Sequence, residues 1–379
     1  MNSKINCANL KQMKILGIET SCDDTAAAVI EAKGGLNRPF FSVLANTSYS
    51  QVAIHKKFGG IVPNLASRAH FQKIYPTIKG ALSAAKTKID DIDLIAVTRG
   101  PGLMPSLLIG INAARALAYR FRKPIIGINH IEGHIYSNWL ANKNIEFPAL
   151  VLTVSGGHTE LVLMKNYGKY RVVGRTLDDA AGEAFDKAAR LLGLGFPGGP
   201  AIAAMAAKSP SFAKASEGKQ IKLPRPMLNS KDFNFSFSGL KTAVLYLYND
   251  LINPEKSKTS GARKYSAEEI KPAFAAEVQN AIVDVLISKT IKAVEKFNPK
   301  TIMVSGGVSA NKKLPEIMAE KVAPYGIPLL IPDLAYTTDN AAMIAVAGYF
   351  SAKGGSPEGG NYPSKNSWKN LAADANLEL

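Results

Sequence analysis

The chain has 379 residues, 46% of them hydrophobic, and a mean hydropathy close to zero. This length allows two domains with separate cores, and no apolar run approaches the roughly 18 residues that a membrane span needs. The N-terminal stretch MNSKINCANLKQMK lacks the apolar core of a secretion signal, and the two cysteines, Cys7 and Cys22, offer neither a disulfide framework nor zinc-finger spacing. We therefore expect a cytoplasmic protein that does not enter a membrane.

The chain is strongly basic, because 46 Lys and Arg residues against 30 Asp and Glu give a formal net charge of +16. This balance favours a polyanionic partner, with nucleic acid ahead of an anionic membrane surface. Part of the excess is clustered, since the stretch from Lys208 to Lys231 holds six basic residues and a single acid, Glu217. The same stretch is rich in Ser and Pro, which predicts an irregular basic loop.

Short apolar runs alternate with helical patterns through the first 148 residues. Lys14–Ile18 and Thr25–Glu31 are expected to form two strands of a hairpin whose turn carries two carboxylates, Asp23 and Asp24. The other elements expected in this half are strands at Phe40–Leu44, Leu94–Val97 and Pro124–Ile128 and helices at Leu65–Lys86, which Pro76 could break, and Ser106–Arg120. The last of these strands leads into a short helix at His130.

The same plan begins again after Pro148. Ala149–Val154 and Glu160–Leu163 flank a turn of Ser155, Gly156, Gly157 and His158. Further strands are expected at Tyr170–Arg175, Thr301–Val304 and Ile327–Ile331, and the last long helix at Asp339–Phe350. Strands that alternate with helices predict an α/β architecture with a largely parallel sheet. The repetition predicts a duplicated domain with a ligand cleft between its halves.

These patterns suggest a division of the chain into lobes. We place the first lobe at residues 14–148 and the second at 149–338, with a basic insertion at about 208–271. The helix at 339–352 is expected to pack back on the first lobe. Residues 353–379 are rich in Gly, Pro and Ser, so we expect a loosely held tail that re-docks from Trp368 to Leu379.

Two histidines, His130 and His134, are spaced so that a helix brings both imidazoles to one face, where they could bind one metal ion. A zinc peptidase is disfavoured, because Glu132 lies midway between them and projects about 200° from the histidine face. A third ligand is needed. Asp339 is one candidate, and its alternative role is that of an acid at the start of the last helix, where the helix dipole favours negative charge.

Two Gly-Gly turns, Ser155-Gly156-Gly157 and Ser305-Gly306-Gly307, each follow an apolar strand. Glycine turns leave backbone N–H groups free to meet an anion, and neither turn is a Walker A loop, since no Gly-Lys-Ser/Thr follows. We interpret them as equivalent points of the two half-repeats that bind a nucleotide or an acyl phosphate, with plain tight turns as the alternative.

Four acids follow the second hairpin, namely Asp178, Asp179, Glu183 and Asp186. The last three fall at helical spacing on one face, and we expect them to line a cleft and bind hydroxyl groups, although such a stripe is more often solvated surface. Farther on, Phe233–Lys241 alternates aromatic and small polar residues. These aromatics could stack on nucleic-acid bases or could belong to the core.

Eight stretches together resemble the family of universal tRNA threonylcarbamoyladenosine transferases, formerly described as O-sialoglycoprotein endopeptidases. They are GIETSCDDTAAAV (17–29), NHIEGH (129–134), VSGGHTEL (154–161), DDAAGEAFDKAARLLGL (178–194), PGGP (197–200), FSFSGLKTA (235–243), VSGGVSAN (304–311) and TDNAAMIA (338–345). The similarity spans about residues 14 to 350. It implies two duplicated lobes of the fold shared by actin, heat-shock 70 chaperones and sugar kinases, around a nucleotide cleft.

The resemblance also implies a reaction. The threonylcarbamoyl group passes from threonylcarbamoyl-AMP to the exocyclic amine of the adenosine just 3′ of the anticodon, in tRNAs that read codons beginning with adenine, and AMP is released. Implied partners are the tRNA, a paralogous actin-like scaffold subunit and a small ATPase subunit. The implied ligands are one divalent ion, iron(II) or zinc, and threonylcarbamoyl-AMP or ATP/AMP in the cleft.

The family's site residues are carried over position by position. The metal ligands implied are His130, His134 and Asp339, and Asp23 matches an acidic hairpin turn that could handle the proton of the attacking amine. The implied contacts with the adenylate are Val154, Ser155, Gly156, Gly157, His158, Asp186, Gly199 and Asn311. Two other functions stay open: a small-molecule kinase of the same fold, which would not need the histidine pair, and a non-catalytic scaffold, which would lack the metal ligands.

Overall fold

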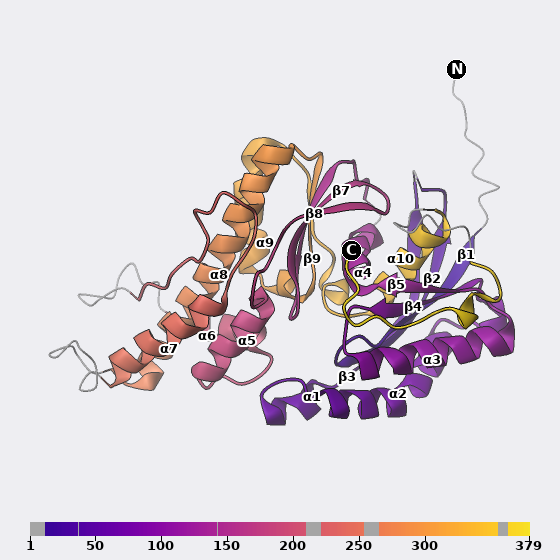
Figure 1. Cartoon of the computed structure of the whole chain (residues 1–379), viewed down its shortest axis with the longest axis horizontal. Helices are drawn as coiled ribbons and strands as arrows, with labels where there is room; N and C mark the ends of the chain where they lie inside the picture. Colours follow the sequence, from indigo (N-terminus) through magenta and orange to yellow (C-terminus); the bar gives the residue numbers. More distant parts are fainter. Residues whose placement is uncertain (1–11, 37, 142, 210–220, 254–264, 355–362) are drawn as a thin grey trace, which may run out of the picture.

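The computed structural model describes residues 12–36, 38–141, 143–209, 221–253, 265–354 and 363–379. It is an α/β structure built around two five-stranded sheets (Figure 1). We call the first sheet with the helices packed on it lobe 1, and the second sheet with its helices lobe 2. Within the described chain no helix is both long and apolar enough to cross a membrane.

The two sheets have the same topology. Lobe 1 contains β1 (Met13–Glu19), β2 (Asp24–Lys33), β3 (Phe40–Ser50), β4 (Leu94–Gly100) and β5 (Ile125–Asn129), in the order β3-β2-β1-β4-β5. Lobe 2 contains β6 (Ala149–Val154), β7 (Thr159–Asn166), β8 (Lys169–Arg175), β9 (Thr301–Ser305) and β10 (Leu329–Leu330), in the order β10-β9-β6-β7-β8. In each, an antiparallel three-stranded meander is followed by two strands parallel to its first strand.

This shared topology confirms the expected duplication and corrects one detail. The sheets are mixed, not largely parallel, because each half opens with a hairpin, and a hairpin forces its strands to be antiparallel. The two Gly-Gly turns are also not equivalent points of the two halves. Both follow strands of lobe 2, β6 and β9, and these strands are neighbours in one sheet.

Helices cover both sheets. The α-helices of lobe 1 are α1 (Val52–His55), α2 (Pro63–Ala84), α3 (Met104–Phe121) and α4 (His130–Tyr136), and those of lobe 2 are α5 (Ala181–Leu191), α6 (Gly198–Ala206), α7 (Ser238–Ile252), α8 (Ala267–Phe297) and α9 (Lys313–Val322). The last helix, α10 (Ala341–Ala352), returns to lobe 1. Short 3₁₀ turns occur at η2 (Lys56–Phe58), η3 (Ile89–Asp91), η4 (Ser137–Ala141), η6 (Gly307–Ala310), η7 (Ala323–Tyr325), η8 (Leu334–Tyr336) and η9 (Ser367–Lys369).

The α2 helix runs through Pro76 without ending there, so the break that Pro76 could cause does not occur. Proline removes one backbone hydrogen bond, which costs a helix about 3 kcal/mol. Burial offsets this cost, because Ile74, Thr77 and Ile78 around the proline are buried against sheet 1. Tertiary packing here overrides local propensity.

The α10 helix is held against sheet 1, on the face opposite α2 and α3. All twelve of its residues are buried. Two glycines allow the close approach: a Cβ at Gly17 of β1 would lie 2.1 Å from the Ala341 carbonyl oxygen, and one at Gly348 would lie 2.6 Å from the Ala96 Cβ. The α10 helix thereby becomes part of lobe 1, next to α4.

The inner faces of the two sheets share one core through α4 and α10, which lie between them (Figure 1). A cluster of aromatic side chains packs at one end of this shared core, which we call the joint between the lobes. Tyr136 of α4 and Tyr167 of lobe 2 each stack on Phe350 of α10, with ring centroids 4.4 and 4.9 Å apart. Because α4 belongs to this joint, any group on its surface is held by both lobes.

Candidate metal centre

The chain turns from β5 directly into α4, and Asn129 caps the helix. Its side-chain oxygen accepts hydrogen bonds from the backbone N–H groups of Ile131 and Glu132, at 2.8 and 3.4 Å. The cap fixes where the helix starts and thereby which residues face inward. His130 and His134 lie on one face as the spacing predicts, with ring centroids 4.6 Å apart.

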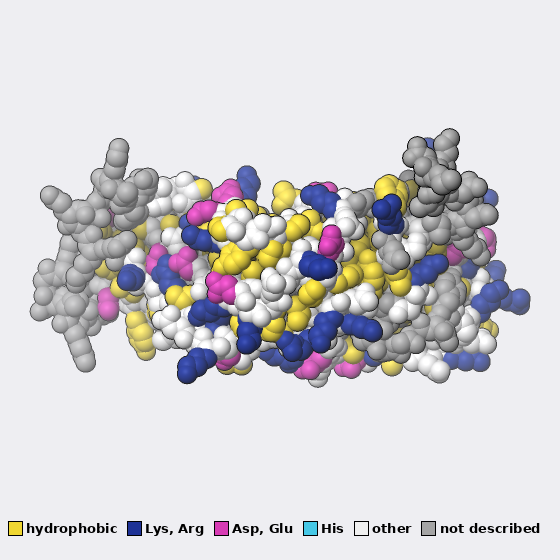
Figure 2. All heavy atoms as spheres, turned by 90° about the horizontal axis from the view of Figure 1, so that it is seen from above, with side chains coloured by type: hydrophobic (Ala, Val, Ile, Leu, Met, Phe, Trp, Pro, Cys, Tyr) yellow, Lys and Arg dark blue, Asp and Glu magenta, His cyan; other side chains and the backbone are white. Residues whose placement is uncertain are grey.

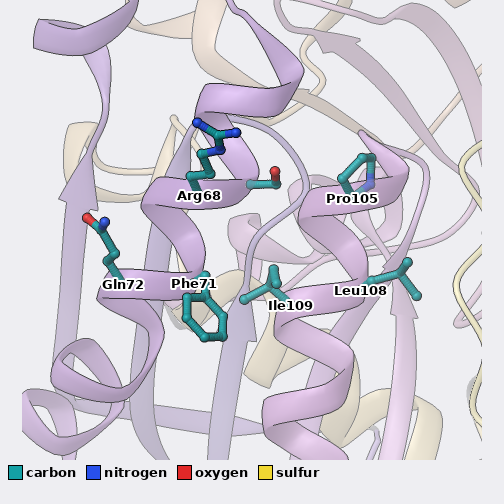
Figure 3. A pocket seen from close by; sticks show the side chains of 7 residues that line it. Arg68, Phe71, Gln72, Pro105, Leu108 and Ile109 are labelled. Atoms are coloured by element: carbon teal, nitrogen blue, oxygen red, sulfur yellow. The ribbon is translucent and has the colours of Figure 1, made fainter.

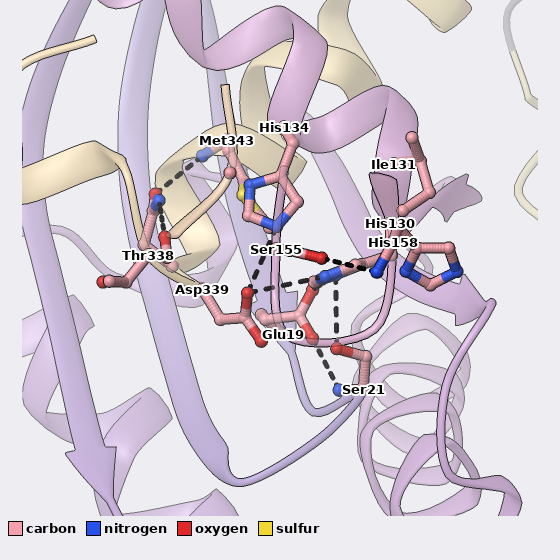
Figure 4. A network of polar contacts seen from close by, with 12 residues as sticks. Glu19, Ser21, His130, Ile131, His134, Ser155, His158, Thr338, Asp339 and Met343 are labelled. Carbon is pink, nitrogen blue, oxygen red and sulfur yellow. Dashed lines mark hydrogen bonds and ion pairs between the residues drawn. The ribbon is translucent and has the colours of Figure 1, made fainter. Parts of the chain in front are cut away.

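Asp339 reaches the same point from the other end of the chain (Figure 4). Its Oδ1 lies 3.5 Å from Nε2 of His130 and 3.2 Å from Nε2 of His134. It does not act as an acid inside the last helix, because α10 begins at Ala341 and is capped by Asn340. The carboxylate therefore approaches the histidines from a loop that the capped helix holds in place.

These three side chains form the cluster of metal-binding type found among the described residues, with their candidate ligand atoms all within 4.8 Å of one another. Nδ1 of His134 is buried without a hydrogen-bond partner, and the contact of its Nε2 is with the Asp339 carboxylate. Buried polar atoms of this kind are rare unless something else satisfies them. Two imidazole nitrogens and one carboxylate oxygen suit zinc or iron(II) better than magnesium, and three protein ligands leave a position open for a substrate. The residues present thus fit a catalytic metal ion.

A second layer of contacts orients His130. Its Nδ1 donates to Oε2 of Glu19 at 3.1 Å, and the hydroxyl of Ser21 lies 3.2 Å from the same nitrogen. Glu19 is fully buried and accepts two further hydrogen bonds, from the Ser21 backbone N–H and the Thr98 hydroxyl. A carboxylate on the outer nitrogen of a histidine ligand fixes its tautomer and makes it a stronger ligand.

Reasoning from the sequence missed Glu19 as a site residue. The available signal was a charged residue at the end of the apolar strand Met13–Glu19, where all other buried side chains are apolar. A fully buried carboxylate needs partners, which points to a function nearby.

The pKa values of the two histidines in the cluster are shifted in opposite directions. Burial opposes charge on His130, but the Asp339 and Glu19 carboxylates raise its pKa well above the usual value. Burial lowers the pKa of His134, so this ring is neutral. Burial would raise the pKa of Asp339, yet His130 and His134 hold it well below the usual range. Without a metal cation, the proton on His130 offsets part of the negative charge of the Asp339 and Glu19 carboxylates, and a bound cation would displace that proton.

The β6–β7 turn borders this cluster. Ser155 donates its backbone N–H to the His158 carbonyl at 2.8 Å, and the His158 N–H donates to the Ser155 hydroxyl at 3.1 Å. Burial and the neighbouring His130 and His134 lower the pKa of the His158 ring to about 4, so it is neutral near pH 7. Gly156 and Gly157 between them are exposed, with open space beside both.

The β9 turn lies against the β6 turn. Gly306 has a positive φ of 87°, and a Cβ there would lie 2.4 Å from the Val154 carbonyl oxygen, so glycine is required. The α5 helix also starts beside this pair, since the Gly182 N–H donates to the Ser155 carbonyl at 3.2 Å. The two Gly-Gly turns therefore adjoin, and they face the lobe boundary on the side of the histidines.

The remaining candidate residues are Asp186, Gly199, Asp23 and Asn311. Asp186 on α5 accepts from the Gly198 N–H at 2.6 Å, which holds the open Gly199 backbone beside it. Burial, with the nearby Asp339 charge and a smaller contribution from Asp186, raises the pKa of Asp23 in the hairpin of lobe 1 to about 6. Asn311 lies farther along lobe 2, where its amide donates to Gln279 at 3.0 Å. No contact found among the described residues joins Asn311 to the histidine cluster.

The predicted acidic stripe of Asp179, Glu183 and Asp186 is wrong for two of its members. Asp179 precedes α5, which begins at Ala181, and both Asp179 and Glu183 bind Lys187, at 2.6 and 2.8 Å. Asp178 instead accepts hydrogen bonds from residues 236–238 at the start of α7. Only Asp186 is left to face the cleft.

The aromatic segment and part of the basic loop are structural. Phe235 and Phe237 are fully buried in the core of lobe 2, so they do not stack on bases. Arg225 pairs with Glu277 and with Asp284, the latter at 2.8 Å. Residues 210–220 of the predicted loop lie outside the described residues.

Fold and site together define the class: two duplicated actin-like α/β lobes with a histidine–carboxylate cluster at their joint. Among solved structures, full-length HypF in its phosphate- and nucleotide-bound form matches with a TM-score of 0.53 at 13% identity, covering 91% of this chain and 46% of that one. HypF of T. kodakarensis also matches at 0.53, covering 92% and 48%. At such identities the likeness shows the fold alone.

Sequence comparisons then give the family. The family model for tRNA N6-adenosine threonylcarbamoyltransferase matches residues 42–346. A protein of that name from Dehalococcoides mccartyi is 48% identical over 349 residues, which is 92% of this chain and 96% of the relative. One from Bacillus subtilis is 47% identical over 339 residues, 89% and 90%. The chain belongs to the tRNA N6-adenosine threonylcarbamoyltransferase family, which confirms the resemblance drawn from the motifs.

Proposed function

We propose that this protein transfers the threonylcarbamoyl group from threonylcarbamoyl-AMP to the exocyclic amine of the adenosine just 3′ of the tRNA anticodon. The observation that carries this proposal is the cluster of His130, His134 and Asp339 beside the Gly156-Gly157 turn, in a member of a family named for this activity. A non-catalytic scaffold would not need three converging metal-binding groups, and a kinase of this fold would not need the histidine pair.

The transfer reaction depends more on positioning the two reactants than on a strong nucleophile. The donor is a mixed anhydride of a carbamic acid and AMP, so its carbonyl carbon is already activated. The adenosine nitrogen forms a bond to that carbon, the bond from carbon to the phosphate oxygen breaks, and AMP leaves with the electron pair. The amine gives up one proton. Orientation of the two reactants and stabilisation of the charge on the oxygens supply most of the rate.

His130, His134 and Asp339 would hold one iron(II) or zinc ion. When bound, this ion supplies a Lewis acid and a template for the donor's oxygen atoms. Glu19 keeps the His130 ring turned toward the site through the 3.1 Å hydrogen bond to Nδ1. The buried α4 and α10 helices hold the three ligands in place.

The exposed N–H groups of the Ser155–His158 turn and the backbone at Gly199 are proposed to hold the AMP part of the donor. The same groups would hold AMP or ATP. Neutral His158 can offer one hydrogen bond without adding charge. Asn311 and Asp186 are proposed to contact the adenosine of the donor from either side of lobe 2.

Asp23 is the proposed acceptor of the amine's proton. Its pKa near 6 is close to the range in which a carboxylate serves as a general base at neutral pH. Part of this shift comes from the Asp339 charge, which a bound cation would offset, so the pKa of Asp23 should fall somewhat in the metal-loaded enzyme. Asp23 lies in the β1–β2 turn, from which it can move toward the cleft.

The tRNA is proposed to bind through basic surface near the site. The formal charge of +16 supports this, and Lys and Arg side chains recur across the face seen in Figure 2. Lys208, Lys222 and Lys231 of the basic loop are exposed, whereas Arg225 is engaged by its two carboxylates. Charge reversal of these three lysines should weaken tRNA binding and flatten its salt dependence. The same change at exposed Lys79, Lys86 and Lys88, at the far end of α2, is the control.

The paralogous scaffold subunit is proposed to dock on the outer face of α2 and α3. A groove there is lined by apolar side chains that include Phe71, Leu108 and Ile109 (Figure 3). Phe71 and Tyr75, on neighbouring turns of α2, are each 71% exposed. Exposing two large aromatic side chains to water is unfavourable, and exposed apolar patches of this kind mark interaction sites. Phe71→Glu with Leu108→Glu should abolish binding of the scaffold and leave metal binding intact, and Tyr325→Glu in lobe 2 is the control. The small ATPase subunit is a further proposed partner, and we assign it no surface.

The test of the function is a transfer assay. Purified protein with its scaffold partner, threonylcarbamoyl-AMP and unmodified tRNA should yield threonylcarbamoyladenosine, detected by mass spectrometry of the digested tRNA. Asp339→Ala should abolish the product, while Asp333→Ala, an exposed acid of the same loop, should not. A wild-type complex that binds tRNA and donor but forms no product would favour the scaffold role.

A further inference from the structure

The C-terminal residues 363–379 run along the outer edge of lobe 1 (Figure 1). The Ser367 hydroxyl donates to the Ile125 carbonyl at 2.8 Å and accepts from the Ile125 N–H at 3.2 Å, so it binds both backbone groups of the first residue of β5. Trp368 packs edge-on against Tyr119 of α3, with ring centroids 5.1 Å apart. The segment is thus anchored to the strand that leads into α4.

Farther on, the segment crosses the carboxyl end of β4. The Asp374 N–H donates to the Arg99 carbonyl at 2.8 Å, and the Gly102 N–H donates to the Ala375 carbonyl at 3.2 Å. A Cβ at Gly100 would collide with the Asp374 carbonyl oxygen at 1.7 Å, so the two backbones are in close contact. These contacts fix the path of the last residues.

The segment then meets the cap of α4. The Asn129 side-chain N–H donates to the Glu378 carbonyl at 3.1 Å, while its oxygen caps the helix. One planar amide therefore joins the start of the helix to the end of the chain. His130 is the next residue, and the N–H groups that the amide oxygen accepts from, those of Ile131 and Glu132, belong to the helix turn that carries this first histidine.

Glu378 also contacts the other lobe. Its carboxylate accepts from Arg175 of β8 at 2.9 Å, and both side chains are largely exposed, at 72% and 45%. Exposed pairs of this kind contribute little stability and open readily. The backbone of Glu378 is thus bound to lobe 1, and its side chain makes a weak, releasable contact with lobe 2.

We propose that Asn129 and the C-terminal residues Leu377–Leu379 position the histidine pair, with the Glu378 carbonyl holding the Asn129 amide in the orientation that aims His130 at Asp339. Asn129 is a positioning residue, since it touches neither reactant. The Arg175–Glu378 pair makes a smaller contribution by holding the end of the segment. This inference rests on the proposed metal site.

The test uses cobalt(II) as a spectroscopic probe of the full-length protein. Its affinity and its visible absorption report ligand geometry without any turnover. Asn129→Ser keeps a capping oxygen and loses the donor to Glu378, whereas Asn129→Ala loses both. A chain that ends at Asn376 loses the acceptor. Circular dichroism and thermal unfolding verify that each variant is folded, and Asn376→Ala and Lys169→Ala are exposed controls on the segment and on β8.

Asn129→Ser and the shortened chain should each bind cobalt about tenfold more weakly, the lower end of the effect of partners that orient metal ligands, with a changed absorption spectrum. The two changes together should weaken binding no further than the shortened chain alone, because both break the same hydrogen bond and the shortened chain already lacks the Arg175–Glu378 pair. Arg175→Ala should cost about twofold to threefold, as expected of an exposed pair.

Wild-type affinity and spectrum in Asn129→Ser, beside weak binding in Asn129→Ala, would show that only the helix cap matters and would overturn the proposal. Losses that multiply in the combined variant would overturn it as well. If the shortened chain does not fold, the two Asn129 variants carry the test. A wild-type protein that binds no cobalt would refute the proposed metal site itself.

Discussion

Gly17→Ala offers a direct test of how packing controls the site, because this glycine decides how closely α10 approaches sheet 1. The added Cβ would lie 2.1 Å from the Ala341 carbonyl oxygen and 3.0 Å from the Ala345 Cβ. Real Cβ atoms essentially never come closer than 3.0 Å to another atom. The helix start must therefore move away by about 1 Å, at a cost of about 1–3 kcal/mol in the free energy of unfolding.

The same movement displaces Asp339, two residues before Ala341, relative to the histidines on α4. Metal–ligand distances tolerate only about 0.2 Å of variation. A displacement of about 1 Å should weaken metal binding strongly and reduce transfer by roughly a hundredfold. Competition with a chromogenic chelator measures the affinity, and denaturant unfolding measures the stability.

Gly348→Ala is the matched control. Its Cβ would lie 2.6 Å from the Ala96 Cβ, so it overpacks the same interface near the far end of α10. We expect a similar loss of stability and a much smaller loss of metal affinity. Equal losses of affinity in the two variants, or wild-type affinity in Gly17→Ala, would refute the reasoning that links this packing to Asp339.

Three further predictions follow from single contacts. Glu19→Gln should weaken metal binding by about 10–100-fold, measured by chelator competition, because Nδ1 of His130 loses its carboxylate partner. Asp24 has a pKa raised to about 7 by burial and by the neighbouring acids, and its Oδ1 is buried without a hydrogen-bond partner. Ionisation of Asp24 therefore lowers the free energy of unfolding as pH rises from about 4 to about 7. Asp24→Asn removes this loss, so it should raise the free energy of unfolding of the metal-free protein by about 1–2 kcal/mol at pH 8 and leave it unchanged below pH 3.5. Equal pH profiles for the two proteins would contradict this. Asp178→Ala should lower the free energy of unfolding by about 1–3 kcal/mol at pH 7, because the start of α7 loses its acceptor. The carboxylate's pKa is lowered by its Ser236, Phe237 and Ser238 hydrogen bonds despite partial burial, so this difference should shrink as pH falls below about 4 in urea-unfolding curves.

Much of the fold could be predicted from local patterns. The two hairpins follow from apolar runs interrupted by short polar or glycine turns. The strand expected at Phe40–Leu44 extends to Phe40–Ser50 in the structure. The partner strands and the order of the sheets could not be read from one chain, because pairing depends on contacts far apart in sequence. Pro76 shows the converse case, since burial of its neighbours sustains a helix that the local rule would end.

Only part of the metal site could be predicted from local sequence patterns. Helical spacing brought His130 and His134 together, but nothing local pairs them with Asp339, which lies over two hundred residues away. Family resemblance supplied that residue, and the packing of α10 on β1 gives the physical reason. The prediction that Asp179 and Glu183 face the cleft was wrong, because both carboxylates pair with Lys187. The spacing of acids along the sequence does not show which lysine they pair with.

The central claim is that one metal ion, held by His130, His134 and Asp339, makes this chain a threonylcarbamoyl transferase. The most direct measurement is the rate of transfer to tRNA while a chelator-stripped protein is titrated with iron(II) or zinc. We predict that activity rises in proportion to added metal and levels off at about one equivalent per chain, as a single three-ligand site requires. His134→Ala should stay inactive at the same metal concentrations. Full activity in the stripped protein, or in His134→Ala without bound metal, would contradict the account.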